Sequence, residues 1–533
     1  MRLCLAKAGI AENPRPPYGA IAPLSRRTGS FIGGAVTSTR PLPREFGPGQ
    51  PGLIIGAVIV LVAARLAGAA LIPLGPDETY YLLWSHFPAA SYYDHPPMVA
   101  WWIAASTVLF GDSPFGVRAI STLSTIPSTV AVYLTGRVLF DRTTGERAAL
   151  WINAMLLIGV GSILATPDAP AVMFWALAVL ALALVMRTGQ GVWWPAVGLC
   201  AGLGVLSKLT DLFLGLGVVL AAIAVRDLRR WLISPWFWTG GLVALVVVAP
   251  MLMWNAGHDW ITLTKQFSRI DTGALTFVKP VEFIATQFAV LNPLVAIFVG
   301  LGIVVWIRRR PVNANGAMGL LAWTLIPIVA YMVVHSFHEA VQGHWLAPIF
   351  PTLAVIAAAA AGTARPERWA GLKALVFPVG AILSAAGLIL AANPGGFLPF
   401  RLDPGQIIRD WDKVAADAEA MRRDAGAEWI ATTYYGVEGE IAYHLRREGV
   451  PVIAVVERAR YAYAPPPDPS LLGKPVLLVS KDAAGSLARC FVNVVSVGSI
   501  ERRNGARLLD TFNVYKASGA TAAAFDPGCD RAR

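Results

Sequence analysis

Long apolar stretches dominate the first 392 residues and limit the fold more than any other feature of this sequence. A helix needs about 20 mostly apolar residues to cross the hydrocarbon core of a bilayer. Only 14% of the 533 residues are charged, whereas charged residues make up about a quarter of a typical soluble domain. We therefore predict an all-α polytopic membrane protein with about eleven transmembrane helices, at residues 51–74, 115–139, 147–166, 169–186, 192–207, 209–225, 235–253, 285–307, 318–336, 345–362 and 372–392.

The placement of Lys and Arg predicts how these helices are oriented. The net charge is +11, but the basic residues gather in short loops between apolar stretches, so we expect no nucleic-acid partner. Short loops rich in Lys and Arg stay in the cytosol. The alternate loops are acidic, and 75–96 contains no Lys or Arg; only 254–284 departs from the pattern. We therefore expect an integral inner (plasma) membrane protein with a cytosolic N-terminus and acidic extracytoplasmic loops.

Composition divides the chain into three parts. Residues 1–50, rich in Pro, Gly and Arg, are interpreted as a disordered cytosolic tail, 51–392 as the membrane domain and 393–533 as a small soluble α/β domain. An odd number of spans places this last domain on the periplasmic side. Within it, the patterns predict helices in 403–429 and 438–449 and strands in 428–436, 451–457, 474–480 and 491–500.

Two cysteines of the C-terminal domain, Cys490 and Cys529, would then share an oxidising compartment. A disulfide between them is consistent with that compartment, but spacing alone does not decide whether the two residues pair. The role of the domain is equally open at this point, and acceptor recognition follows only from its expected location.

The segment 75–102 concentrates polar chemistry at the end of the first span. It holds three carboxylates, two histidines, four tyrosines and three tryptophans. Each feature has an ordinary explanation: acids stabilise a first helical turn, Asp94 before His-Pro-Pro can cap a turn, and Tyr and Trp are common at membrane interfaces. The apolar patch 96–111 is short and aromatic, which predicts an interfacial helix. The combination favours a site at the membrane boundary.

Five segments of the chain, in order, resemble a known group of membrane enzymes. They are PDETYYLLWS, YYDHPP, ATPDAPAVMFWALAVLAL, AGLGVLSKLTDLFLGLGVVL and PMLMWNAGHDWITLTKQF. The chain is similar to the membrane glycosyltransferases related to protein O-mannosyltransferases, which include bacterial aminoarabinose transferases of lipid A and other lipopolysaccharide sugar transferases. The resemblance covers about residues 50–360. It implies the GT-C fold, a polyprenyl-phosphate monosaccharide donor, a periplasmic active site, inversion at the anomeric carbon, and an acid of the first external loop as catalytic base.

Asp77 is our first candidate for this base, because a positioned carboxylate can take the proton of an acceptor hydroxyl. Glu78 is its rival, since adjacent helical residues point about 100° apart and do not serve the same proton. Asp94, His95 and Asp168 are expected to bind the sugar or the acceptor. For Asp168, a cap at the start of the next span is a competing explanation.

The leaving phosphate requires a cation or preorganised hydrogen-bond donors. No cofactor is certain from the sequence, and a divalent metal ion held by Asp77 and Asp168 is one alternative. Lys208 lies between two apolar stretches, where a lysine is costly unless it has a partner. A donor phosphate would be such a partner, and Asp211 is the alternative.

Two further segments complete the predicted substrate site. Lys265 and Arg269 are four residues apart, so both can contact phosphate from one helix face, or simply bind lipid headgroups. The loop 335–345 contains three histidines at intervals of three and six residues, a poor match to a helical zinc pair. The resemblance implies that His344 or Trp345 contacts the sugar instead.

The expected partners are a polyprenyl-phosphate sugar donor, membrane lipids, and an acceptor that is lipid A, another lipid, a glycan or a protein. A transporter or flippase of lipid-linked sugars is the main alternative, although the internal repeat typical of many transporters is not apparent. A noncatalytic scaffold would leave the ordered segments unexplained. Hydrolysis or polymerisation of lipid-linked glycans would use the same carboxylate chemistry and stays open.

Overall fold

The computed structural model describes residues 45–268, 274–308, 316–363, 366–392, 404–481 and 489–529. The membrane part begins with α2 (Pro51–Leu71), α3 (Pro76–Ser85), α4 (Met98–Phe110), α5 (Pro114–Leu123), α6 (Thr125–Leu139), α7 (Arg142–Asn153), η1 (Leu157–Gly161), α8 (Asp168–Thr188), α9 (Trp193–Ser207) and η2 (Leu209–Asp211). It continues with α10 (Leu212–Ala224), α11 (Arg226–Arg229), η3 (Arg230–Ile233), α12 (Pro235–Ala256), α13 (Ile261–Phe267), α14 (Val278–Val290), α15 (Pro293–Arg308), α17 (Ala317–Ser336), η5 (Gly343–Ile349), α18 (Phe350–Thr363) and α19 (Pro366–Ala392).

The C-terminal domain, residues 404–529, is described apart from 482–488. Its elements are η7 (Pro404–Ile408), α20 (Trp411–Asp424), β1 (Trp429–Thr432), α21 (Tyr435–His444), β2 (Val452–Ala454), η8 (Arg458–Tyr461), η9 (Pro469–Gly473), β3 (Val476–Ser480), β4 (Phe491–Asn504), β5 (Arg507–Ala520) and η11 (Ala522–Ala524). The predicted boundary at residue 393 and residues 1–44 of the predicted tail lie outside the described residues.

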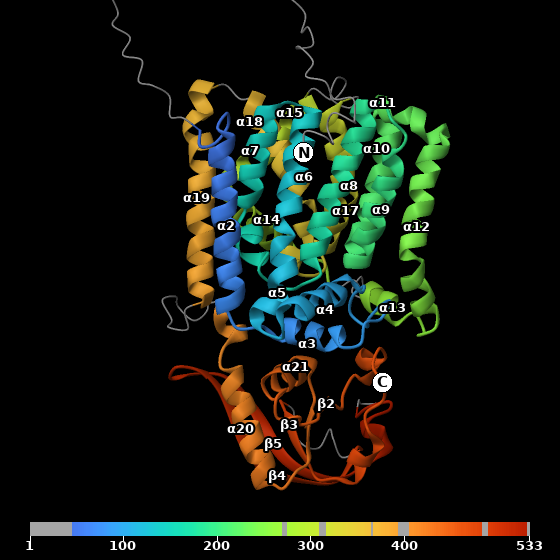
Figure 1. Ribbon diagram of the computed structural model, residues 1–533, viewed down its shortest axis with the longest axis vertical. Helices are drawn as coiled ribbons and strands as arrows, with labels where there is room; N and C mark the ends of the chain where they lie inside the picture. The colour runs from blue at the N-terminus through green and yellow to red at the C-terminus, as the bar shows by residue number, and fades with distance from the viewer. Residues whose placement is uncertain are drawn as a thin grey trace, which may run out of the picture.

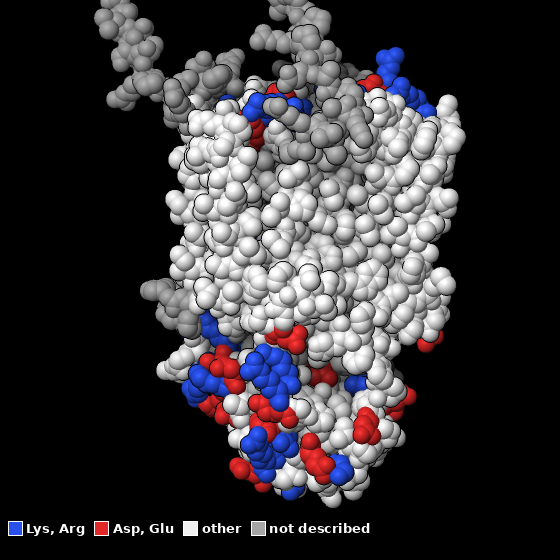
Figure 2. Space-filling view, in the orientation of Figure 1, with Lys and Arg blue, Asp and Glu red and all other residues white. Residues whose placement is uncertain are grey.

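The long helices stand side by side in one bundle, with the C-terminal domain beneath one end (Figure 1). The outer helices expose large apolar side chains, such as Ile59 of α2 at 61% and Leu242 of α12 at 60%. Figure 2 shows that, on the face in view, charged residues lie at the two ends of the bundle and on the C-terminal domain, with a broad uncharged band between them. Such a band suits hydrocarbon, in which a charged side chain is costly.

The number of spans does not match the prediction of about eleven. In the described part of the chain, six helices are long and apolar enough to cross a membrane, or up to eight if each of two bent helix pairs counts as one span. The predicted span at 115–139 is divided into α5 and α6 at Ser124, and the one at 147–166 contains the π-helical turn η1. Helix α9 has only 15 residues. An apolar pattern does not reveal such breaks, so the eleven spans are not confirmed.

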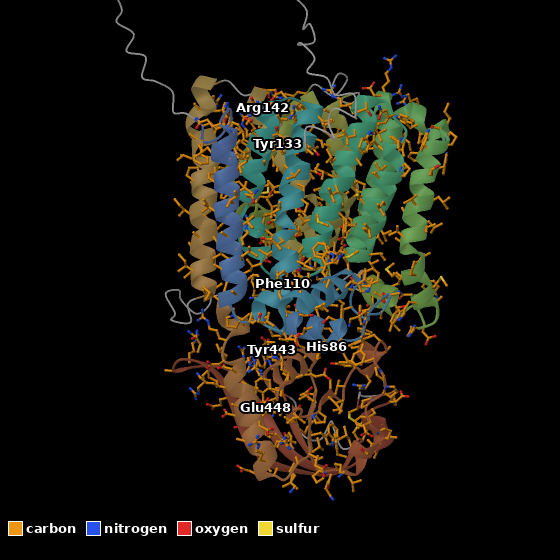
Figure 3. The ribbon with its side chains drawn as sticks, viewed as in Figure 1. His86, Phe110, Tyr133, Arg142, Tyr443 and Glu448 are labelled. Atoms are coloured by element: carbon orange, nitrogen blue, oxygen red, sulfur yellow. A yellow bond between two sulfur atoms is a disulfide. The ribbon has the colours of Figure 1, made fainter. Side chains whose placement is uncertain are left out.

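Three short helices, α3, α4 and α5, lie across the end of the bundle, between the long helices and the C-terminal domain (Figure 1). Helix α4 has 13 residues, which agrees with the short helix expected in 96–111. A cavity of about 590 Å³ at this junction is lined by His86, Phe110 and Tyr443, among others. Figure 3 shows these three side chains here, and Tyr133 and Arg142 toward the opposite end of the bundle.

The C-terminal domain is built on a five-stranded sheet with the strand order β2-β1-β3-β5-β4. Strand β1 pairs in parallel with β2 and β3, whereas β5 is antiparallel to both β3 and β4. Leu477 and Val479 of β3 pack with α20 and α21, and Val476 and Leu478 pack on the opposite face. Strand β3 is therefore buried on both faces, as its continuous apolar sequence indicates.

Each predicted strand and helix of this domain has a counterpart in the structure, with shifted ends, but the prediction lacks β5. The sequence of β5, RLLDTFNVYKASGA, interrupts its apolar residues with Asp, Asn, Lys and Ser, and part of the strand is exposed. Cys490 and Cys529 form a disulfide with their Cα atoms 5.7 Å apart, so the pairing that the spacing left open is present. This disulfide links the residue before β4 to the segment that follows η11.

Helices α9 and α12 meet through glycines. A Cβ atom on Gly198 would lie 1.8 Å from the carbonyl oxygen of Gly240, and one on Gly240 would lie 2.6 Å from that of Trp194. Small residues of this kind let two helix backbones approach closely in a membrane. The contact between α9 and α12 therefore depends on the absence of side chains at these positions.

We predict that Gly198→Leu lowers the free energy of unfolding by about 1–3 kcal/mol, because the new side chain overpacks the contact. The measurement is the unfolding midpoint of the purified protein in detergent. Gly215→Leu in α10 is the matched control, since a Cβ there meets nothing within 4 Å. An equal loss of stability in both variants would contradict the assigned contact.

Candidate active site

A cavity of about 640 Å³ lies where the membrane helices meet the C-terminal domain. Its walls come from α3, the segment after it, α6, the start of α8, η2, α17, η5 and α21. Seven of the ten site residues predicted from the sequence line this one cavity: Asp77, Asp94, His95, Asp168, Lys208, His344 and Trp345. Their roles stay predictions, but the structure brings them together from segments far apart in the sequence.

Asp77 lies in the first turn of α3, which begins at Pro76. Proline at this position and acids in the first turn both favour a helix start. Asp77 is accessible through the cavity, although protein atoms surround its carboxylate closely, and its Oδ1 accepts a hydrogen bond of 3.0 Å from the hydroxyl of Tyr435. Burial raises the pKa of Asp77, and the Tyr435 hydrogen bond partly opposes that rise. The group is thus a better proton acceptor than an ordinary aspartate.

Glu78, the alternative base, does not line the cavity. Its carboxylate is buried and accepts hydrogen bonds of 2.7 and 2.5 Å from Nε and Nη2 of Arg118. The backbone N–H groups of Gly75 and Ala165 donate to it at 3.1 and 2.9 Å. Four donors therefore occupy the carboxylate, which argues against Glu78 as the base and for a structural role.

Arg118 extends this contact to a third segment. Its Nη1 donates to the carbonyl oxygen of Ile72 at 2.5 Å and its Nη2 to that of Pro73 at 2.8 Å. The pair formed by Glu78 and Arg118 therefore joins the end of α2, the start of α3, α5 and the backbone at Ala165. Glu78 follows Asp77 directly, and Ala165 precedes Asp168 by three residues. The Glu78–Arg118 pair therefore holds the backbone next to Asp77 and close to Asp168.

Asp168 and Lys208 form an ion pair, with 2.6 Å between Oδ1 and Nζ. The alternative pairing of Lys208 with Asp211 is wrong: Lys208 points to an acid 40 residues away, and the buried Asp211 carboxylate accepts no hydrogen bond from the described residues. Nε2 of His344 lies 3.9 Å from Asp168 Oδ2. The first residue of α8 is thus flanked by a cation and an imidazole at the cavity wall.

Asp94 is held by two groups on one oxygen. Its Oδ2 accepts a hydrogen bond of 3.2 Å from the Tyr80 hydroxyl and forms an ion pair with Arg460. The guanidinium of Arg460 lies 4.9 Å from the ring centre of Tyr93 and 4.7 Å from that of Tyr435. Arg460 and Tyr435 belong to the C-terminal domain, and neither is among the site residues predicted from the sequence. The only signal was local: each lies in a Tyr-rich stretch, TTYYG or RARYAY, of a domain without a recognised motif.

The remaining predicted residues are less well placed. The Lys265 ammonium lies 5.3 Å from the ring centre of Tyr93, and Lys265 does not line the cavity. Arg269 lies outside the described residues. Trp345 lines the cavity from η5, and its ring centre is 5.6 Å from that of His335.

A metal ion held by Asp77 and Asp168 stays a prediction. Within the described ranges, three or more His, Cys, Asp or Glu side chains nowhere form a group able to hold a metal ion. The ammonium of Lys208 contacts Oδ1 of Asp168. Positive charge at this wall is therefore supplied by a lysine.

We predict that Arg118→Met lowers the free energy of unfolding by about 3–5 kcal/mol, because it leaves the charge of Glu78 buried without its partner. Thermal unfolding in detergent measures the effect, and the double variant Glu78→Met/Arg118→Met should recover part of the loss. Lys474→Met is the control, since it breaks an exposed pair with Glu428 that is worth about 0–1 kcal/mol. Equal losses in both single variants would refute the structural role of Glu78.

Parts of the chain are similar to known proteins. Residues 94–254 match the family described as dolichyl-phosphate-mannose-protein mannosyltransferase. The lipid A galacturonosyltransferase RgtD of Rhizobium johnstonii is 25% identical over 391 residues, which cover 69% of this chain and 77% of that protein. An undecaprenyl phosphate-alpha-4-amino-4-deoxy-L-arabinose arabinosyl transferase of Pseudomonas fluorescens is 35% identical over 199 residues, covering 34% of this chain and 35% of its own length.

The fold has a close counterpart among solved structures. The crystal structure of ArnT from Cupriavidus metallidurans bound to undecaprenyl phosphate matches with a TM-score of 0.64 and 16% identity, over 90% of this chain and all of that one (100%). The resemblance expected from the sequence is thus confirmed. Part of the chain is thus similar in sequence to GT-C membrane glycosyltransferases of the protein O-mannosyltransferase and aminoarabinose transferase group, and the chain shares its fold with ArnT.

Proposed function

We propose that the chain transfers a monosaccharide from a polyprenyl-phosphate donor to lipid A or a similar envelope acceptor. One observation carries the proposal: Asp77, Asp168 and Lys208 line a single cavity at the boundary of an apolar helix bundle. A candidate base and a candidate phosphate-binding cation thus share one cavity. The proposal is supported by the similarity to a lipid A galacturonosyltransferase and to an undecaprenyl phosphate-aminoarabinose arabinosyl transferase, and by the fold shared with a protein crystallised with undecaprenyl phosphate.

The cavity provides the surfaces that such a donor needs. Apolar side chains such as Ile152, Leu157 and Val172 line it together with the polar groups, and they suit the prenyl chain. Lys208 suits the phosphate, because an ammonium forms strong charge-assisted hydrogen bonds with phosphate oxygens. Its Nζ carries three donors, so it can contact the phosphate while it stays paired with Asp168.

In the proposed reaction, Asp77 takes the proton of an acceptor hydroxyl as that oxygen forms a bond to the anomeric carbon of the sugar. The bond between this carbon and the donor's phosphate oxygen breaks, and the polyprenyl phosphate leaves with the electron pair. Attack from the face opposite the phosphate inverts the anomeric configuration. Lys208 stabilises the negative charge that develops on the phosphate. The raised pKa of Asp77 suits a base that works near neutral pH.

We further propose that the cavity faces the periplasm and that the N-terminus is cytosolic. The C-terminal domain lies at the same end of the bundle as the cavity (Figure 1) and contains the Cys490–Cys529 disulfide. Disulfides persist in oxidising compartments such as the periplasm. The Lys- and Arg-rich loops of the sequence support the same orientation.

We predict that Asp77→Asn lowers kcat/KM for sugar transfer about 10²–10⁴-fold, the usual contribution of a general base. The assay follows label from a panel of radiolabelled polyprenyl-phosphate sugars into lipid A in proteoliposomes. The matched control is Asp227→Asn, an exposed aspartate of α11 outside the cavity, which should transfer sugar like the wild type.

Equal rates for Asp77→Asn and the wild type would rule out Asp77 as the base. The absence of transfer by the wild type with every donor would contradict the proposed reaction. Movement of the donor lipid across the bilayer without transfer would instead identify a flippase, the main alternative from the sequence.

A further inference from the structure

The C-terminal domain contacts α3, the helix that carries the proposed base Asp77. Helix α21 packs on α3 so closely that a Cβ on Gly439 would lie 2.8 Å from Thr79 Oγ1 and 2.9 Å from the Tyr80 nitrogen. A Cβ on Gly436 would lie 2.9 Å from Pro76 Cβ. These two glycines, one turn apart, thus let α21 lie against α3. Figure 1 shows α21 directly below α3.

This contact brings the first residue of α21 to the proposed base. The Tyr435 hydroxyl donates a hydrogen bond to Asp77 Oδ1 at 3.0 Å, and Tyr435 itself lines the catalytic cavity. Its ring centre lies 4.6 Å from that of Tyr80, the residue that donates to Asp94. Burial raises the pKa of the Tyr435 hydroxyl, so this group stays a hydrogen-bond donor throughout the pH range of an enzyme assay.

A second residue of the domain secures the other acid. Arg460 is buried, pairs with Asp94, and is itself held by a contact of 2.6 Å from its Nε to Glu457. Its guanidinium stacks against Tyr435 and Tyr93, so the two contributions of the domain touch each other. The charge of Asp94 raises the pKa of Asp77, and a cation paired with Asp94 limits that effect.

We propose that the C-terminal domain is a working part of the active site, in which Tyr435 positions the carboxylate of Asp77 and favours its ionised form, and Arg460 fixes Asp94 beside it. Both are positioning residues that act through the two acids. The proposal rests on the function proposed above, and it assigns this domain a role beyond recruiting an acceptor. A domain that only recruited the acceptor would not need a hydrogen bond to the base.

The hydrogen bond predicts the direction of a pH effect. A donor to a carboxylate favours the ionised form, so its removal raises the pKa of the acid. A base must be ionised to accept a proton, and activity therefore falls as the pH drops through its pKa. Without the Tyr435 hydroxyl, this acid limb of the pH profile should begin at a higher pH.

The test compares wild type, Tyr435→Phe and Tyr515→Phe as full-length proteins in proteoliposomes. Tyr515 lies in β5 within the core of the C-terminal domain, so Tyr515→Phe is a matched change away from the cavity. In Tyr435→Phe we expect the acid limb of kcat/KM to move up by about half to one pH unit, with rates that approach the wild type at high pH. In Tyr515→Phe the limb should stay in place.

A uniform loss of rate without a shift of the limb would overturn the proposal, because a purely structural change acts at every pH alike. A readout without catalysis separates this outcome from failure of the proposed reaction. The infrared band of the Asp77 carboxylate is isolated with labelled aspartate, by subtracting the spectrum of the matching Asp77→Asn variant. This band should titrate at a higher pH in Tyr435→Phe than in the wild type. If the band shifts in this way and no sugar is transferred, only the proposed reaction is wrong. If the band does not shift, the proposed role of Tyr435 is wrong.

Arg460 is tested through its partner. Arg460→Met should unfold at a lower temperature than the wild type, and Asp94→Asn/Arg460→Met should recover part of that loss, because the double variant leaves no buried carboxylate without its cation. Arg503→Met, which removes a largely exposed arginine of β4 from its pair with Glu501, is the control and should leave the unfolding temperature unchanged. Additive losses in the double variant would show that Arg460 does not act through Asp94.

Discussion

The buried ion pair between Glu78 and Arg118 is the contact on which the arrangement of the site depends. A charged pair without access to water is stable only when further hydrogen bonds satisfy both groups. Here backbone groups of Ile72, Pro73, Gly75 and Ala165 supply them. The pair thereby joins four segments of the chain at the end of the bundle, and two of these segments carry the acids of the cavity.

This arrangement divides the work between two adjacent acidic residues. Glu78 is fully occupied inside the protein, whereas Asp77 opens onto the cavity with one hydrogen bond from Tyr435. The contacts of Glu78 therefore hold the adjacent Asp77 in place, and they leave the Asp77 carboxylate open to other hydrogen-bond donors. The same principle applies at Asp168, where Lys208 supplies charge while the nearby backbone is tied to Glu78. The proposed base and the proposed phosphate site are thus held relative to each other.

The membrane helices and the C-terminal domain form one site rather than two independent units. The bundle provides the apolar environment and the acids, and the domain provides Tyr435 and Arg460 at their outer side. Close packing of α21 on α3 through Gly436 and Gly439 makes this possible. The domain thereby places a hydrogen-bond donor on Asp77.

The sequence predicted the acids, Lys208 and the residues of η5 because each lies in a segment with a recognisable pattern. It did not predict the partners, since a pattern carries no information about contacts between distant segments. Arg118 lies 40 residues from Glu78, and Arg460 lies 366 residues from Asp94. For the same reason, the sequence offered the nearby Asp211, and not Asp168, as the alternative to a phosphate partner for Lys208. The eleven spans are not confirmed, because hydropathy does not detect a break such as the one at Ser124. Strand β5 was missed because its exposed face is polar.

The most direct test of this account is a structure of the full-length protein with undecaprenyl phosphate bound, determined by cryo-electron microscopy in lipid nanodiscs. The account predicts a phosphate oxygen at a hydrogen-bond distance of about 2.7–3.2 Å from Lys208 Nζ, in the cavity onto which Asp77 opens, and the prenyl chain along the apolar wall. A phosphate bound outside this cavity, with Lys208 contacting only Asp168, would contradict it.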